Sequence, residues 1–155
     1  MKKGENKNHP KKGSRIKVEP IRDVKDIRAI KKLLDGNPMY SALLTLGINT
    51  NLRASDLLRI TAGKVRGLKA MDEIELKEKK TGKTRRITLN KACVEALTRL
   101  LASRSFDDDT PIFQGERGTL TVPSVNRLVK SWCKAINLKG NYGAHTLRKT
   151  FGYQQ

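Results

Sequence analysis

The sequence predicts an α+β fold that is mostly helical and carries one small antiparallel β-hairpin sheet. In several segments, apolar residues recur every three or four positions, which is the period of an amphipathic helix. Between residues 73 and 89 the period changes to alternation around Thr81-Gly82, which is typical of a hairpin. A chain of 155 residues can bury one core, so we assign residues 20–155 to one domain and residues 1–19 to a basic flexible tail.

Polar caps mark the first two predicted helices. Asp23 is expected to cap a helix that runs to about Leu34. Asn37-Pro38 begins a second helix, with Asn as the cap and Pro in the first turn. Residues 47–51 are predicted to form a turn. The expected inward residues are Val24, Ile27, Ile30 and Leu34 in the first helix and Met39, Leu43 and Leu46 in the second.

A short helix and a hairpin follow. Arg53 stands at the entrance of the short helix, whose apolar residues are Leu57, Leu58 and Ile60. Ile74 and Leu76 alternate with polar residues before Thr81-Gly82, and Ile87 and Leu89 alternate after it. The tip of this hairpin is cationic and contains Lys79, Lys80 and Lys83.

The remaining segments predict three more helices. Asn90 caps one of them, residues 103–109 form a polar acidic loop, and Pro123 opens the next helix. After a loop at residues 137–143, a last helix begins near His145. The inward residues expected in the first two of these helices are Cys93, Val94, Leu97, Leu100, Leu101, Val125, Leu128, Val129, Trp132, Cys133 and Ile136.

The charge of the chain is strongly one-sided. Lys and Arg total 33, Asp and Glu total 15, and the net charge is +18 at pH 7. Residues 1–17 and residues 76–91 each hold seven basic residues and one acidic residue, and residues 125–155 hold six basic and no acidic residues. Such a field favours a polyanionic partner over the simpler interpretation, in which the charges only aid solubility.

Other classes of protein are disfavoured by what the sequence lacks. It has no apolar run near the roughly 20 residues that span a bilayer, and its basic N-terminus lacks the apolar stretch of a secretory signal. We therefore expect a cytoplasmic, nucleoid-associated protein without a membrane partner. Cys93 and Cys133 lie far apart on apolar helix faces and are expected to be buried thiols. The sequence shows no carboxylate cluster, and we expect no metal and no cofactor.

One phosphate-binding motif can be rejected. Lys80-Thr81-Gly82-Lys83-Thr84 ends like a P-loop, but that motif needs a second Gly at position 77, where this chain has Lys. A P-loop also lies between a strand and a helix, whereas a second strand is predicted here.

Several basic residues could instead gather around one phosphate. Arg53, a hairpin lysine and the His145-x-x-Arg148 pair follow one another in the order short helix, hairpin and last helix. Arginine offers a planar fork of donors and keeps its charge, which suits the non-bridging oxygens of a phosphodiester. Histidine can donate to such an oxygen or assist proton transfer. We expect these four side chains to lie within roughly 10 Å of one another.

This ordered set resembles the catalytic domain of the tyrosine recombinases, the phage integrase family, over roughly residues 20–155. Residues 51–58, Asn-Leu-Arg-Ala-Ser-Asp-Leu-Leu, resemble the first box of the family, Gly-Leu-Arg-x-Ser-Glu-Leu. His145-Thr146-Leu147-Arg148 resembles the second box, His-x-x-Arg. Lys80 matches the catalytic lysine of the hairpin, with Lys83 as the competing candidate.

The resemblance implies a role for each residue. Arg53, Lys80, His145 and Arg148 are the expected catalytic residues, and Asp56, in place of the usual Glu, is expected to orient Arg53. Lys80 would protonate the departing 5′ oxygen. The resemblance implies duplex DNA as partner, cut and rejoined through a 3′-phosphotyrosine without a metal. Further DNA contacts are expected from Lys79, Lys83, Arg85, Arg86 and Lys149.

The tyrosines depart from the family pattern. In the family, another His or Trp and then the nucleophilic Tyr follow a few dozen residues after the second box, whereas only Tyr153 follows Arg148 here. We expect Tyr40, Tyr142 and Tyr153 to be structural and the chain to be a catalytic domain that ends before its nucleophile. The alternatives are a non-catalytic DNA-binding remnant of an integrase and, more remotely, an RNA- or ribosome-associated protein. We expect a monomer in isolation, whereas the family acts as tetramers on DNA.

Overall fold

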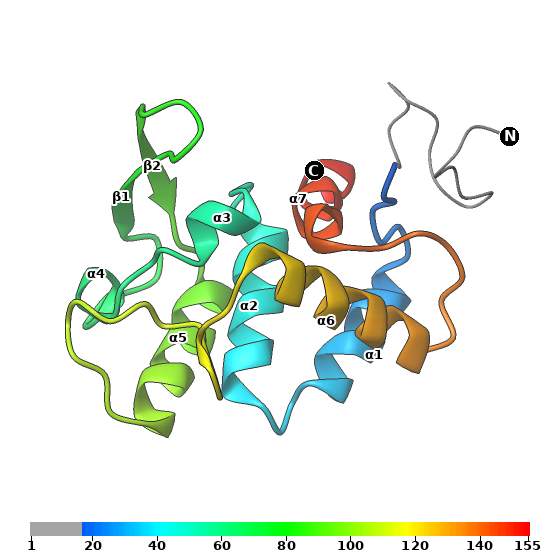
Figure 1. Ribbon diagram of the computed structural model, residues 1–155, viewed down its shortest axis with the longest axis horizontal. Coiled ribbons are helices and arrows are strands. Elements are labelled where there is room, and N and C mark those ends of the chain that lie inside the picture. Colours follow the sequence, from blue (N-terminus) through cyan, green and yellow to red (C-terminus); the bar gives the residue numbers. More distant parts are fainter. Residues whose placement is uncertain (1–16) are drawn as a thin grey trace, which may run out of the picture.

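The computed structural model describes residues 17–155, and it has the predicted α+β, mostly helical fold (Figure 1). The helices are α1 (Val24–Leu33), α2 (Pro38–Asn49), α3 (Ala54–Leu57), α4 (Ala62–Val65), α5 (Lys91–Ser103), α6 (Val122–Ala135) and α7 (Ala144–Gln154). The strands are β1 (Glu73–Lys77), β2 (Thr84–Thr88), β3 (Gln114–Gly115) and β4 (Gly118–Thr119).

Strands β1 and β2 form the predicted antiparallel hairpin, in which Ile74 pairs with Ile87. Ile74, Leu76 and Ile87 are buried while their neighbours along the strands are largely exposed, as alternation requires. Strands β3 and β4 form a second small hairpin that the sequence did not predict, because two-residue strands carry no alternating pattern.

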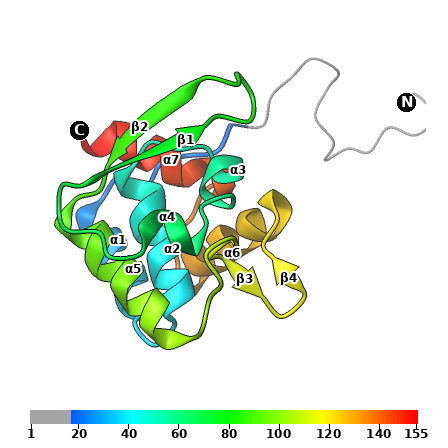
Figure 2. The same cartoon turned by 90° about the vertical axis from the view of Figure 1, so that its left-hand side faces the viewer.

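The long helices surround α2. It packs against α5 and α7, and α7 also packs against α6 (Figure 1). All six residues from Ala42 to Gly47 are buried, as expected for a helix that is apolar on every side. The hairpin, α3 and α7 lie along one edge of the molecule, seen at the top of Figure 1 and again in Figure 2. This edge brings together the three segments that carry the predicted site residues.

Three predicted N-caps are confirmed. The side chains of Asp23, Asn37 and Asn90 accept hydrogen bonds from backbone amides in the first turns of α1, α2 and α5, at 2.9, 3.0 and 2.9 Å. Helix α6 begins one residue earlier than predicted and is capped by Thr121. The prediction that Val24 points inward is wrong, because its exposed fraction is 47%.

The segment before α1 is bound to the far end of the chain. The backbone amide of Glu19 donates to the carbonyl of Asn141 at 2.8 Å, and the amide of Ile21 donates to Thr150 Oγ1 at 2.9 Å. The side-chain amide of Asn141 donates to the carbonyl of Lys17 at 2.9 Å. Residues 17–19 are therefore joined to the domain, and the rest of the predicted tail, residues 1–16, lies outside the described residues.

The core contains both cysteines and the tryptophan, as predicted. Cys93, Trp132 and Cys133 are all buried, and burial raises the pKa of each thiol to about 11. At neutral pH both thiols are therefore protonated and unreactive. Within residues 17–155, no helix combines the length and the apolar character that a membrane span requires.

The predicted turn at residues 47–51 is wrong at its start, because α2 continues to Asn49. Gly47 lies inside the helix at its contact with α7, where a Cβ atom would come within 2.6 Å of Leu147 Cδ1 and 2.8 Å of Leu147 Cβ. The glycine therefore permits two helices to approach closely and does not end α2.

Replacing Gly47 with Ala is expected to lower the free energy of unfolding by about 1–2 kcal/mol. Overpacking against Leu147 costs about 1–3 kcal/mol, and the better helix propensity of Ala offsets about 1 kcal/mol of it. Urea unfolding followed by circular dichroism measures the change. Gly152→Ala is the control, since a Cβ there meets nothing within 4 Å. A Gly47→Ala chain as stable as Gly152→Ala would contradict the packing argument.

Candidate functional site

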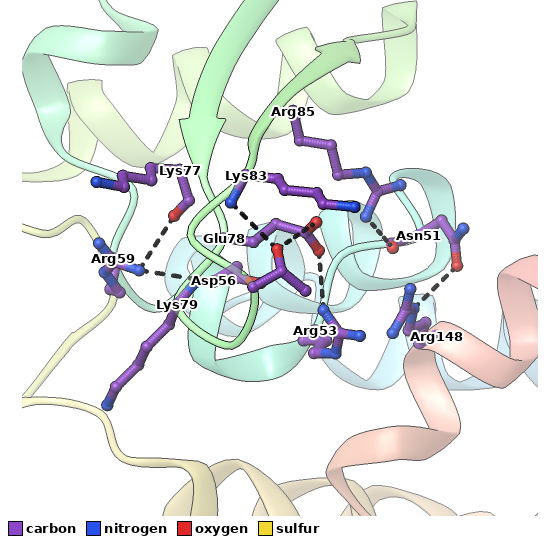
Figure 3. Close-up of polar contacts among 11 residues, drawn as sticks. Asn51, Arg53, Asp56, Arg59, Lys77, Glu78, Lys79, Lys83, Arg85 and Arg148 are labelled. Carbon is purple, nitrogen blue, oxygen red and sulfur yellow. Dashed lines mark hydrogen bonds and ion pairs between the residues drawn. The ribbon is translucent and has the colours of Figure 1, made fainter.

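Arg53 lies at the start of α3, on the edge described above. It is the N-cap residue of the helix and follows Asn51, whose backbone is left-handed with a φ of 55°. Leu52 between them is buried and anchors the segment in the core. The Arg53 side chain is 29% exposed, and its Nη1 donates to Glu78 Oε2 at 2.8 Å (Figure 3).

Glu78 sits at the base of the hairpin tip. Its amide donates to the carbonyl of Lys83 at 2.8 Å, and its carbonyl accepts from the amide of Gly82 at 2.9 Å. Gly82 has a φ of 69°, a conformation that glycine adopts at low cost. This tight turn directs the Glu78 carboxylate back to Arg53, and its side chain is only 13% exposed.

Asp56 holds the hairpin against α3. Its Oδ1 accepts from the backbone amide of Lys79 at 3.0 Å and lies 3.7 Å from Arg59 Nη1. The side chain is 2% exposed, and Oδ2 has no hydrogen-bond partner among the described residues. The sequence predicted that Asp56 orients Arg53, whereas the carboxylate paired with Arg53 belongs to Glu78. The sequence offered one hint of Glu78, which is the single acidic residue among residues 76–91.

The second box begins α7. The amide of Ala144 donates to Asn126 Oδ1 at 3.0 Å, which fixes the start of the helix. His145 and Arg148 are three positions apart and therefore lie on one side of α7. Arg148 Nε donates to Asn51 Oδ1 at 3.1 Å, so the second box contacts the first residue of the first box (Figure 3).

Arg53, Arg85 and Arg148 form a cluster that we call the arginine cluster. Arg85 Nη1 donates to the carbonyl of Asn51 at 2.9 Å, which joins β2 to the loop between α2 and α3. Burial, and then the neighbouring charges of Arg53 and Arg85, lower the pKa of Arg148, although arginine stays charged at any working pH. Three guanidinium groups with Glu78 as a close counter-ion favour the approach of an anion.

His145 lies beside this cluster. Its side chain is exposed, yet desolvation by the surrounding protein lowers the pKa of the imidazole, and the charges of Lys149, Arg148 and Arg53 lower it further. The imidazole is therefore neutral at pH 7 and can offer one donor and one acceptor. The structure thus brings together Arg53, His145 and Arg148 of the predicted set.

The hairpin tip is more open. Lys79, Lys80 and Lys83 are all exposed, and the Lys80 side chain makes no hydrogen bond within residues 17–155. Lys80 and Lys83 both remain candidates for the lysine of the site.

The other predicted DNA contacts are arranged differently. Arg85 belongs to the arginine cluster. Arg86 is 73% exposed on the other side of the strand and pairs with Glu75 at 3.0 Å. Lys149 Nζ donates to the carbonyl of Val18 at 2.9 Å, so it also holds the segment before α1.

None of the three tyrosines faces the arginine cluster. Tyr142 is buried, and its hydroxyl donates to the carbonyl of Lys139 at 3.0 Å. The ring of Tyr40 lies 5.9 Å from that of Trp132. Tyr153 is 53% exposed, and its ring lies 5.9 Å from the guanidinium carbon of Arg22. Each tyrosine therefore has a packing partner elsewhere. Across residues 17–155 no group of three or more His, Cys, Asp or Glu side chains is placed to hold a metal ion.

Affinity for duplex DNA is expected to rise about threefold as the pH falls from about 7.5 to about 5.5. The pKa of His145 is lowered in the free chain, so acidification below the ordinary value of 6.5 creates a new positive charge beside the arginine cluster. An anion favours that charged form, and the gain should disappear in His145→Gln. Fluorescence anisotropy with a labelled duplex measures it.

The control is His9→Gln, which removes the other histidine of the chain. Acidification has the opposite effect on the stability of the free protein, because the pKa of His145 is lowered in the folded chain. The unfolded chain takes up the proton at a higher pH than the folded chain, so the free protein loses stability as the pH falls below about 6.5. A pH response that persists in His145→Gln contradicts the assignment to His145.

Comparisons with known proteins agree on one family. The sequence profile of the Phage integrase family matches residues 22–154. Probable integrase/recombinase YoeC of Bacillus subtilis (strain 168) is 30% identical over 139 residues, which cover 88% of this chain and 74% of YoeC. Tyrosine recombinase XerC of Caldanaerobacter subterraneus subsp. tengcongensis is 34% identical over 114 residues, which cover 70% of this chain and 31% of XerC.

Solved structures of recombinases share the fold. The crystal structure of XerA recombinase superimposes with a TM-score of 0.70 at 18% identity, over 86% of this chain and 49% of XerA. XerH recombinase bound to difH substrate gives 0.67 at 20% identity, over 85% of this chain and 41% of XerH. The Tn1549 transposon integrase in complex with transposon right end DNA gives 0.69 at 15% identity, over 94% of this chain and 53% of the integrase. The chain thus spans about half the length of each of these proteins or less.

Proposed function

Because the chain belongs to the phage integrase family, we propose that it binds duplex DNA and supplies the cationic part of a site that cuts and rejoins strands. The observation that carries this proposal is the arginine cluster. Arg53, Arg85 and Arg148 come from three separate segments and meet beside His145. Like charges repel, so their gathering indicates a site for a phosphate.

The chemistry follows from where charge develops. When an oxygen nucleophile attacks the phosphorus of a phosphodiester, negative charge grows on the two non-bridging oxygens, and Arg53 and Arg148 would stabilise it. His145 would donate a hydrogen bond to one of those oxygens. The P–O5′ bond breaks, and the departing 5′ oxygen takes a proton, which Lys80, exposed at the hairpin tip, is suited to give. The phosphoryl group is then held on the nucleophile, and the reverse reaction rejoins the strand.

The nucleophile distinguishes this proposal from the second candidate function, a DNA-binding module without catalysis. In the family resemblance the nucleophile is a tyrosine, and the packing of Tyr40, Tyr142 and Tyr153 away from the arginine cluster favours the second candidate for this chain by itself. Both candidates share the DNA contact. We expect an intracellular monomer in isolation, and tetramers only on DNA.

The chain is expected to bind a nicked duplex without forming a covalent adduct, since a cationic clamp without a nucleophile can hold a phosphate and not attack it. A denaturing gel after incubation with a nicked or suicide duplex measures the adduct. Tyr153→Phe is the matched variant. A denaturation-resistant band that disappears in this variant would show that Tyr153 is the nucleophile. An adduct that forms only when a longer form of the protein is used would support the recombinase over the DNA-binding module.

A further inference from the structure

Asn51 contacts two members of the arginine cluster at once. Its side-chain Oδ1 accepts from Arg148 Nε at 3.1 Å, and its backbone carbonyl accepts from Arg85 Nη1 at 2.9 Å. Figure 3 shows Asn51 between these two arginines, with one dashed contact to each. Arg53 follows two positions later, so this residue joins α7 and β2 to the start of α3.

The contact with Asn51 uses one particular edge of the Arg148 guanidinium. A guanidinium has one Nε–H and two Nη groups, and Asn51 uses the Nε edge. The two Nη groups then keep their donors for the two oxygens of a phosphate, which is the usual bidentate arrangement. Without a partner at Nε, the long arginine side chain would sample several rotamers before each binding event.

The contact is also neutral. An amide oxygen fixes the guanidinium and leaves its charge uncompensated, whereas a carboxylate at the same place would neutralise it. Arg53 is already paired with Glu78, whereas Arg148 makes no ion pair within residues 17–155 and feels the Glu78 and Asp56 carboxylates only from a greater distance.

The backbone explains why few residue types could replace Asn51. Its φ of 55° lies in the left-handed region, which Gly, Asn and Asp enter most readily. Of these three, only Asn presents a neutral acceptor. Asn51→Gly therefore removes the side-chain amide while keeping both the backbone conformation and the carbonyl that holds Arg85.

We propose that Asn51 is a positioning residue that holds the Arg148 guanidinium by its Nε edge so that its Nη groups face the phosphate. This inference rests on the proposed function, because it assigns the direction in which Arg148 meets DNA. It makes Asn51 a determinant of phosphate binding that acts through Arg148.

The test compares the whole chain with Asn51→Gly and Asn51→Asp. Hydrogen exchange of the Arg148 Nε–H, followed by NMR, is expected to be about tenfold faster in Asn51→Gly. Affinity for a labelled duplex should fall about fivefold in that variant, while the slope of log affinity against log salt stays unchanged because no charge is lost. Asn51→Asp restores the Nε–H protection but should lower the slope by about one, since its carboxylate neutralises Arg148.

Thermal unfolding separates this role from a purely structural one, and the melting temperature of Asn51→Gly should remain close to that of the wild-type chain. The proposal is overturned if the Arg148 Nε–H exchanges at the same rate in Asn51→Gly as in the wild-type chain. It is also overturned if this exchange becomes faster while the affinity for the duplex stays the same. If Asn51→Gly fails to fold, the test rests on Asn51→Asp, in which the slope of log affinity against log salt should fall by about one. An unchanged slope in this variant would contradict the proposal. A wild-type chain that binds no duplex overturns the proposed function, whereas the exchange experiment still reports whether Asn51 holds Arg148.

Discussion

The affinity of this chain for duplex DNA is expected to fall about a thousandfold between 50 and 200 mM monovalent salt. Three regions of the sequence each carry a net charge of +6, and two of them contribute to the edge formed by the hairpin, α3 and α7. Each phosphate that a Lys or Arg neutralises releases counterions, and several such contacts make the salt dependence steep. Fluorescence anisotropy titrations at a series of salt concentrations measure the slope.

A neutral osmolyte at matched osmolality is the control, because it leaves the counterions unchanged. A slope of log affinity against log salt near zero would show that the chain does not bind DNA through phosphates. The net charge of +18 would then be explained by its effect on solubility.

The double variant Arg53→Gln/Arg148→Gln is expected to bind duplex DNA about a hundredfold more weakly, if each lost charge-assisted hydrogen bond to a phosphate contributes about 1.4 kcal/mol. The salt slope should fall by about two, one for each lost cation. The single variants should each account for about half of the loss on a logarithmic scale, with some coupling because both arginines meet the same phosphate.

The matched control is Arg28→Gln/Lys32→Gln, which removes the same charge from exposed positions of α1. A similar loss of affinity in both double variants would mean that only the total charge of the chain matters. An unchanged affinity in Arg53→Gln/Arg148→Gln would mean that the DNA lies elsewhere.

The parts of the fold that depend on neighbouring residues could be predicted from the sequence. The caps Asp23, Asn37 and Asn90 act on amides two or three positions away, so their signal is contained in a few residues. Gly47 was misread as a helix end because its partner, Leu147, lies a hundred positions along the chain. A local pattern cannot distinguish a glycine that ends a helix from one that lets two helices meet.

The candidate site also has features that could be predicted from the sequence and features that could not. The resemblance to one family was enough to select Arg53, His145 and Arg148 as candidate site residues, and the charges of the two arginines lower the pKa of His145. The contacts made by these residues were not predictable, because they join segments that lie far apart in the sequence. Glu78 reaches Arg53 across 25 positions, and Asn51 reaches Arg148 across 97. Asp56 shows the converse, since it lies three positions from Arg53 but holds the amide of Lys79.

The pairing of Glu78 with Arg53 means that every incoming anion has a competitor attached to the same chain. A carboxylate held 2.8 Å from the guanidinium by a tight turn acts at an effective concentration of roughly millimolar or above. A free phosphate ion would meet this competitor alone and would gain little by displacing it. If the chain binds DNA as proposed, a duplex would approach with many phosphates at once, and its contacts along the basic edge would offset the loss of the single internal pair. The Glu78 carboxylate would then favour polyanions over small anions at the arginine cluster.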